Sequence, residues 1–285
     1  MDYEFELCDL SWGQFEEIAL EFSGEPPRDC RPPCRYFAMS PSRHSRKTCV
    51  FSFVEGIGGN LSSKIAVNIS HDAIGDKLQR ELQLFEGEGE GGRGAAMEDF
   101  CSSWLIRDAF AEANRSVYGY ASKMATGAKI SATGFLSFFG SHELRLGQVG
   151  AYEGYLWRDS SLSALDEHYT VSRTASSCVG PESRFLERLM GAAPELSIDL
   201  ASTVLEEGDV VVLSSLPPDD AFQGVVEGVL HRGYPLKRTA RILAREAVKL
   251  RFASMASPPY RLETNVVFCL FRVGRFAIRL EQIVS

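Results

Sequence analysis

The sequence lacks two features that would point to a membrane or to nucleic acid. No run of apolar residues approaches the roughly 20 that a helix needs to cross a bilayer. Positive charge is in deficit, since 30 Lys and Arg residues stand against 38 Asp and Glu, for a formal net charge of −8. A polyanion would therefore meet no attractive field. We expect neither a membrane nor a nucleic acid as partner.

The sequence also lacks the cysteine spacings of a zinc site or a disulfide framework. Its seven cysteines are scattered and odd in number, and no Cys-x-x-Cys pair occurs. Three residues separate Cys30 from Cys34, with no second pair or histidine cluster to complete a tetrahedral site. The N-terminal residues MDYEFELCDLSW lack the basic start of a secretory signal. These observations predict reduced thiols and a cytoplasmic protein.

Strands and helices can be predicted from the periodicity that is present. The 285 residues are 45% hydrophobic and 24% charged, which is ordinary for a globular chain. Apolar residues at helical spacing predict helices over 64–84, 97–123, 222–230 and 236–252, the first with a break near Gly75. β-prone runs predict strands over 36–39, 49–54, 129–139, 143–149, 151–158, 199–204, 209–214, 265–273 and 275–280.

These elements predict an α+β protein with antiparallel sheets covered by helices. We expect strands 143–149 and 151–158 to form one hairpin, and strands 265–273 and 275–280 another. No internal repeat and no linker marks a domain boundary, so residues 1–285 are predicted to form one domain. Glu86 to Gly94, EGEGEGGRG, has too many glycines for a stable helix and is predicted to be a loop. Its role, as a docking segment or a plain connection, stays open.

One carboxylate stands out at the end of the apolar strand 49–54. Glu55 is followed by Gly-Ile-Gly-Gly, from Gly56 to Gly59, and then by the first predicted helix. Carboxylates at strand ends hold hard cations, and glycines let the backbone approach a ligand closely. Two interpretations follow. Glu55 is either a metal ligand or a structural acid that hydrogen-bonds a strand-to-helix turn whose glycines supply positive φ.

Several phrases of the sequence resemble those of one family in order and wording. They are Val-Glu-Gly-Ile-Gly-Gly from Val54, Val-Gly-Ala-Tyr-Glu-Gly-Tyr-Leu from Val149, Leu-Asp-Glu-His-Tyr-Thr from Leu165, Leu-Glu-Glu-Gly-Asp from Leu205, and Thr-Asn-Val-Val from Thr264. They are similar to Asp-Gly-Met-Gly-Gly, Val-Gly-Asp-Ser-Arg-Ala-Tyr-Leu, Leu-Thr-x-Asp-His-Ser, Leu-x-x-Gly-Asp and Asp-Asn-x-Thr of the metal-dependent protein phosphatases (the PPM or type 2C family). The resemblance spans roughly Cys34 to Val273. It implies two antiparallel β-sheets in a sandwich flanked by helical layers.

The departures from that family concern its metal site. The resemblance implies four metal-binding aspartates, and the corresponding positions here hold Cys34, Glu55, Ser215 and Thr264. Only Glu55 keeps a carboxylate. Glu55, Gly56, Glu263 and Asn265 would form what remains of such a site. One carboxylate offsets little of the charge of two dications, and a thiol is too soft a ligand for magnesium.

The resemblance and its departures together favour a catalytically inactive phosphatase-like domain, a pseudophosphatase, that acts by protein binding or regulation. On this hypothesis no metal and no other cofactor is expected, and the partner is a protein. The alternative is a divergent but active phosphoserine or phosphothreonine phosphatase that uses Mn or Mg at a site rebuilt around Glu55, with Glu263 and Asp219 or Asp220 contributing. The sequence does not identify the partner or the oligomeric state.

Overall fold

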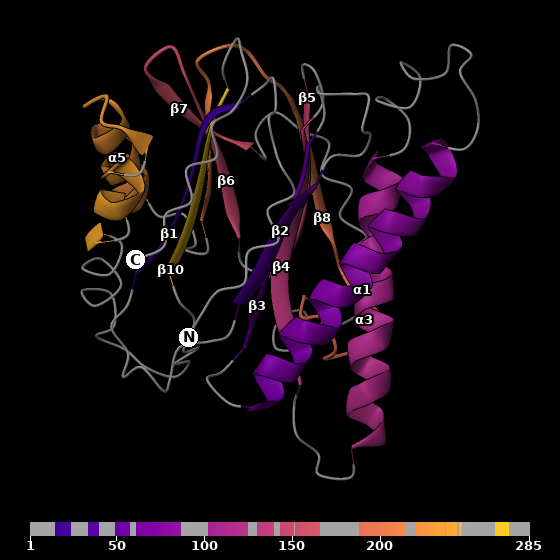
Figure 1. The fold of residues 1–285 in the computed structure, drawn as a ribbon. Coiled ribbons are helices and arrows are strands. Elements are labelled where there is room, and N and C mark those ends of the chain that lie inside the picture. The colour runs from indigo at the N-terminus through magenta and orange to yellow at the C-terminus, as the bar shows by residue number, and fades with distance from the viewer. Residues whose placement is uncertain are drawn as a thin grey trace.

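The computed structural model describes residues 15–23, 34–39, 49–57, 61–86, 102–124, 130–139, 143–150, 152–165, 188–214, 220–236, 238–243, 245–246 and 266–273. Within these ranges the strands form two antiparallel sheets that face each other, with helices on both outer faces (Figure 1). The order of layers is α-β-β-α. The predicted α+β sandwich is confirmed.

Each sheet draws its strands from distant parts of the chain. The first sheet has the order β2-β3-β4-β5-β8, with β2 at Cys34–Met39, β3 at Cys49–Gly56, β4 at Ala132–Phe139, β5 at Glu143–Val149 and β8 at Asp199–Val204. The second sheet has the order β1-β10-β9-β6-β7, with β1 at Phe15–Ser23, β10 at Val266–Val273, β9 at Val210–Ser214, β6 at Glu153–Arg158 and β7 at Ser161–Ala164.

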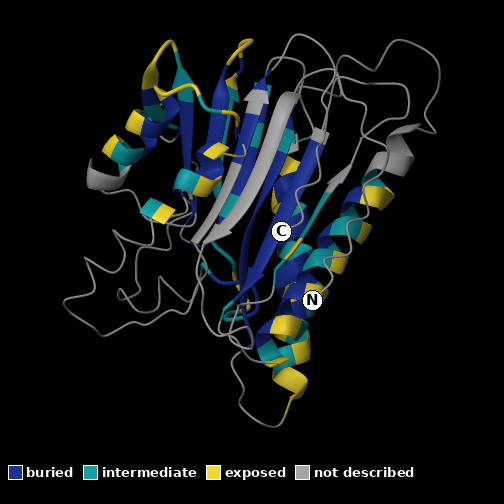
Figure 2. Cartoon of the chain, turned by 60° about the vertical axis from the view of Figure 1, so that its left-hand side comes forward, coloured by how far each residue is buried: buried dark blue, intermediate teal, exposed yellow. Residues whose placement is uncertain are grey.

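The helices cover the outer faces of the sheets. α1 (Leu61–Glu86) and α3 (Ser102–Lys123) lie side by side on the first sheet. α5 (Asp220–Leu230) lies on the second sheet, together with the helical residues 238–243. Both long helices carry a buried stripe toward the sheet and exposed residues outside (Figure 2). Among the described residues, no helix combines the length and apolarity needed to cross a membrane.

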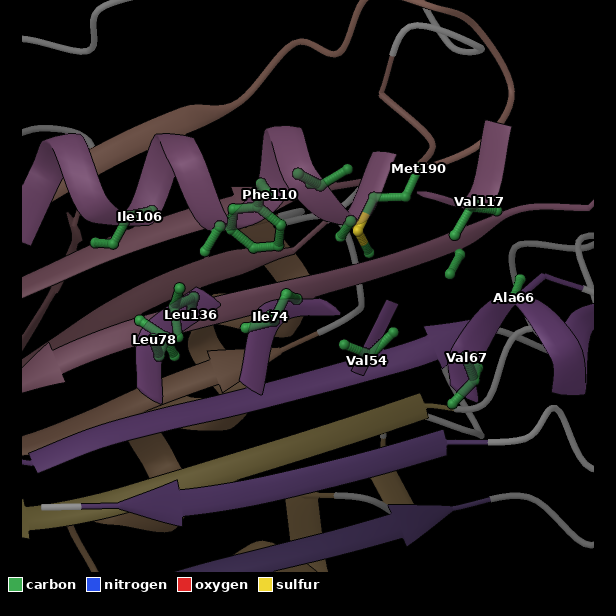
Figure 3. Close-up of a cluster of buried hydrophobic side chains, with 14 of the residues drawn as sticks. Val54, Ala66, Val67, Ile74, Leu78, Ile106, Phe110, Val117, Leu136 and Met190 are labelled. Carbon is green, nitrogen blue, oxygen red and sulfur yellow. The ribbon is translucent and has the colours of Figure 1, made fainter. Parts of the chain in front are cut away.

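Strand alternation divides the buried residues into separate cores. Successive side chains of a strand point to opposite faces. Phe51 and Phe53 of β3 therefore join the core between the sheets, whereas Val50 and Val54 join the core beneath α1 and α3. Figure 3 shows Val54 in that second core, which α3 fills with Ile106, Phe110 and Val117. A third core lies between α5 and the second sheet.

Three of the sequence predictions about elements are wrong. β10 has no open edge for the predicted hairpin with residues 275–280, because it pairs with β1 on one side and with β9 on the other. β5 and β6 do not form a hairpin, because β5 pairs with β4 and β8 whereas β6 pairs with β7 and β9. The chain crosses from one sheet to the other between them. α1 has no break at Gly75, because Ile74 and Leu78 on either side are fully buried against the sheet and hold the helix continuous.

The remaining element predictions are confirmed where the structure describes them. β3, β4, β8, β9, α3 and α5 lie at or within a few residues of the predicted ranges. β1 and the short β7 were not predicted. Of the predicted loop 86–94, Glu86 is instead the last residue of α1, and residues 87–94 lie outside the described residues. Residues 247–252 and the predicted strand 275–280 also lie outside them.

Candidate functional site

β3 carries Glu55 to the end of the strand, on the face that looks into the core between the sheets. Phe51, Phe53 and Glu55 alternate along β3 and share that face. The side chain of Glu55 is almost fully buried, with only 1% of the residue exposed. A carboxylate in such a place requires polar partners, because desolvation of an uncompensated charge is costly.

The strands on both sides of β3 place two further polar side chains in a row with Glu55. Cys34 of β2 pairs directly with Glu55, and Glu55 pairs directly with Thr133 of β4. Directly paired residues of antiparallel strands point to the same face. Thiol, carboxylate and hydroxyl therefore lie next to one another across three strands.

Cys34 is a free, half-buried thiol. Burial, with the negative charge of Glu55 adding to it, raises the pKa of Cys34 from its ordinary 9.0 to about 12. The side chain is thus a neutral thiol at physiological pH. A thiolate would be the metal-binding and nucleophilic form.

Tyr152 contacts two of these three residues, Glu55 and Thr133. It lies in the short connection where the chain crosses from β5 to β6. Its hydroxyl donates a hydrogen bond to Oε2 of Glu55 at 3.4 Å and lies 3.2 Å from Oγ1 of Thr133. Only 3% of the residue is exposed. Burial and then the charge of Glu55 raise the pKa of Tyr152 well above its ordinary value, so the phenol stays a neutral donor.

Aromatic contacts hold the Tyr152 ring in this position. The ring meets Phe53 edge-on at a centroid distance of 6.3 Å and Phe135 at 5.5 Å. Such T-shaped pairs are favourable beyond the area that they bury. Two residues earlier, Gly150 has a φ of +108°, and a Cβ atom there would lie 2.6 Å from Cγ2 of Thr133. A glycine at this position lets the crossing chain pack directly on β4.

The glycine turn after Glu55 packs tightly against the start of α1. A Cβ atom at Gly56 would lie 2.7 Å from the carbonyl oxygen of Ser63. Gly56 is not among the glycines with positive φ, so at this position the sequence requires glycine for space rather than for backbone conformation. The next residue, Ile57, donates its backbone N–H to the carbonyl of Ser131 at 3.1 Å. Gly58 and Gly59 lie outside the described residues.

Of the residues predicted for the site, the structure brings Cys34, Glu55 and Gly56 together. Ser215, Glu263, Thr264 and Asn265 lie outside the described residues, as does Asp219. Asp220 begins α5, and its side chain is not described. The prediction for these positions stays a prediction.

Sequence reasoning missed Tyr152 and Thr133 as parts of the site. One signal was available for Tyr152. It stands where the quoted phosphatase phrase has serine after Val-Gly-Asp, so a bulky aromatic residue replaces a small polar one. Thr133 had no such signal, because its contact with Glu55 depends on strand register.

The described donors around Glu55 do not fit a magnesium or manganese ion. Mg²⁺ takes about six oxygen ligands and keeps several waters. Here the carboxylate faces a neutral phenol, a hydroxyl, a protonated thiol and aromatic rings. Within the described part of the chain, no group of three or more His, Cys, Asp and Glu side chains is placed to hold a metal ion.

Comparison with solved structures identifies the fold of the chain. By sequence, the chain matches no protein-family model and no curated protein. By structure, it is similar to the Streptococcus agalactiae (S. agalactiae) serine/threonine phosphatase at a TM-score of 0.58 and 15% identity, over 90% of this chain and 99% of that one. The chain has the fold of the PPM-type serine/threonine phosphatases.

Two further solved structures agree. Serine/threonine phosphatase Stp1 from Staphylococcus aureus matches at a TM-score of 0.57 and 15% identity, over 94% of this chain and 99% of that one. The catalytic domain of the phosphatase PstP, solved with two manganese ions, matches at a TM-score of 0.51 and 15% identity. The match covers 92% of this chain and 99% of that one. The PPM-type fold implied by the sequence resemblance is confirmed over nearly the whole length of these phosphatase chains. At such identities the likeness concerns the fold alone.

Proposed function

We propose that this chain is a pseudophosphatase, a phosphatase-fold domain that acts by binding a protein rather than by hydrolysis. The observation that carries the proposal is the surroundings of Glu55. Its carboxylate accepts a hydrogen bond from Tyr152 and lies beside the half-buried Cys34 and the buried Thr133. A phosphatase that uses two metal ions requires several anionic oxygens at this end of the sandwich.

Charge and ligand chemistry support the proposal. Two divalent cations carry four positive charges, and Glu55 supplies one negative charge. Cys34 adds none, because the raised pKa keeps its thiol protonated. Ser215 and Thr264 stand where the resemblance implies two of the aspartates, and a hydroxyl is neutral. Metal ions at ordinary concentrations would therefore gain too little to offset their desolvation.

The proposed partner is a protein. A fold that loses its metal ligands but keeps its packed core still presents a surface, and that surface can bind a protein. This step rests on analogy at the level of the fold. The deficit of positive charge argues against a nucleic acid in that role. The free thiol of Cys34 favours a reducing compartment such as the cytoplasm as the place of action.

Calorimetric titration with Mn²⁺ and Mg²⁺, combined with p-nitrophenyl phosphate hydrolysis, tests the proposal. The matched control is Glu55→Gln, which keeps the shape of the side chain and removes its charge. We expect no saturable heat at millimolar cation and no turnover above background in either protein. Metal-dependent hydrolysis that Glu55→Gln abolishes would instead establish a divergent active phosphatase.

A further inference from the structure

Tyr152 contacts the carboxylate that the family resemblance implies as a metal ligand. Its hydroxyl lies 3.4 Å from Oε2 of Glu55 and 3.2 Å from Oγ1 of Thr133, so one phenol engages two members of the polar row. The contact joins residues 97 positions apart in the chain. It forms because the crossing from β5 to β6 passes directly over β4 at Gly150.

We propose that Tyr152 is a cation-excluding residue: its phenol supplies Glu55 with a neutral hydrogen-bond donor, and its ring occupies the space beside the carboxylate. This inference rests on the proposed function and goes beyond it. On the proposed function, cation affinity is low because Cys34, Ser215 and Thr264 stand where the resemblance implies aspartates. Tyr152 is a further position, and it acts by occupying space rather than by removing a ligand.

The environment of the ring explains why a cation would not displace it. Phe53 and Phe135 hold the ring edge-on, and 3% of Tyr152 is exposed. Moving the ring would open an apolar gap between the two phenylalanines. A hydrated Mg²⁺ or Mn²⁺ also brings waters that it sheds reluctantly, and an apolar aromatic wall offers them no hydrogen bonds.

The proposal predicts that restoring a carboxylate is insufficient while Tyr152 remains. Cys34→Asp places a second carboxylate directly opposite Glu55 in the strand register. With Tyr152 present, that carboxylate adds charge but no room for a hydrated ion. Cys34→Asp combined with Tyr152→Ser adds both, because serine is the residue that the phosphatase phrase has at that position.

The test is Mn²⁺ binding by titration calorimetry on the full chain, in Cys34→Asp alone and in Cys34→Asp with Tyr152→Ser. We expect the double variant to bind Mn²⁺ at least tenfold more tightly than the single variant. Adding Glu55→Gln to the double variant is expected to remove that gain, which places the bound ion at Glu55. Equal affinities of the single and double variants, or a gain that survives Glu55→Gln, would overturn the proposal.

A second pair of variants keeps the test decisive where Cys34→Asp fails to fold, as judged by circular dichroism. Thr133→Asp restores a carboxylate on the other side of Glu55 in the same row. The same comparison, with and without Tyr152→Ser, carries the same expected tenfold gain and the same contrary result. The outcome is separate from that of the proposed function, which is decided by turnover of the unmodified chain. A chain without turnover whose Cys34→Asp variant binds as tightly as the double variant would overturn only the role of Tyr152.

Discussion

Asp209 is a buried carboxylate whose hydrogen bonds fasten the turn before β9 to β6. Only 2% of the residue is exposed. Its oxygens accept hydrogen bonds from Nε and Nη2 of Arg158 at 2.9 and 2.6 Å and from the backbone N–H of Glu206 at 2.7 Å. The hydrogen bonds to Asp209 raise the pKa of Arg158, which therefore stays charged. We expect Asp209→Asn to lower the free energy of unfolding by about 2 kcal/mol in urea titrations, because it removes the buried one of the two carboxylates that pair with the half-buried guanidinium of Arg158.

Glu206 provides the matched control for that substitution. It also contacts Arg158, at 2.8 Å from Nη1, but its side chain is 62% exposed. Exposed ion pairs contribute little, so Glu206→Gln is expected to change the free energy of unfolding by less than about 0.5 kcal/mol. Equal losses in the two variants would mean that burial of Asp209 is not what makes its pair with Arg158 important.

Cys34 is predicted to be a slow thiol in the folded protein. A pKa of about 12 in place of 9.0 leaves about 1,000-fold less thiolate at pH 8. Alkylation of Cys34, followed by peptide mass spectrometry, should be at least about 100-fold slower in the native than in the urea-unfolded chain, and should accelerate with pH up to about 12. Glu55→Gln should accelerate it in the native chain, because loss of the negative charge lowers the pKa of Cys34. The unfolded chain serves as control, since there Glu55→Gln should have no effect.

At the residue scale, the sequence predicts which residues belong to the candidate site better than it predicts which of them are in contact. Cys34 and Glu55 could be singled out because both positions have counterparts in the phosphatase phrases, and strand register then places them side by side. The contact of Tyr152 with Glu55 could not be predicted in the same way. It depends on where the chain crosses between the sheets, which no local pattern encodes.

The connection between β5 and β6 requires, at Gly150, a backbone conformation and a close packing that suit glycine. Gly150 has a φ of +108° and no room for a Cβ atom beside Thr133, whereas Gly208 has a φ of +91° with open space around it. We expect Gly150→Ala to cost about 3 kcal/mol of unfolding free energy and Gly208→Ala about 1 kcal/mol, because only the first adds a clash to the backbone strain. Thermal and urea unfolding measure both, and a cost for Gly208→Ala as large as that for Gly150→Ala would contradict the role of the clash.

Elements with a strong period were predictable, and those set by tertiary pairing were not. The buried run of β3 and the apolar stripe of α3 follow from hydrophobic periodicity. α1 continues through Gly75 because burial of Ile74 and Leu78 outweighs the roughly 1 kcal/mol cost of a helical glycine. The false hairpin of β5 and β6 arose because adjacency in sequence suggests pairing, whereas a sandwich also connects neighbouring strands across its two sheets.

For the whole molecule, we predict that the chain unfolds as one unit. The core between the sheets joins Phe51 and Phe135 of the first sheet to Leu213 and Phe271 of the second. Loss of either sheet would therefore expose the apolar face of the other, and one cooperative transition follows.

Two tryptophans in opposite layers can test this expectation. Trp104 lies on α3 beside Lys77, and Trp157 lies on β6 against His231. The third tryptophan of the sequence, Trp12, is replaced by Phe in both single-tryptophan variants. Fluorescence of each variant, followed through urea titration, should give midpoints within about 0.2 M of each other and of the circular dichroism midpoint. Separate midpoints would divide the chain into independently folding parts.

At the scale of the whole molecule, the sequence predicted the architecture but not the pairing of β1 with β10 that completes the second sheet. The α-β-β-α order follows from the elements together with the phosphatase phrases, and the structural relatives confirm it. β1 escaped prediction because residues 15–23 mix acids with aromatics, and what makes them a strand is pairing with β10. That partner lies at the other end of the described chain.

The pairing of β1 with β10 also determines when the second sheet can be completed during translation. Phe15 pairs with Val273, so the ribosome must add 258 residues after Phe15 before its partner exists. At about 5–20 residues per second, that interval lasts roughly 10 to 50 seconds. In the last part of this interval, β6 and β9 are already translated while the position between β1 and β9 stays empty. The nascent chain therefore passes through a stage in which strand edges are unpaired. This is the stage at which chaperones would have the most time to bind.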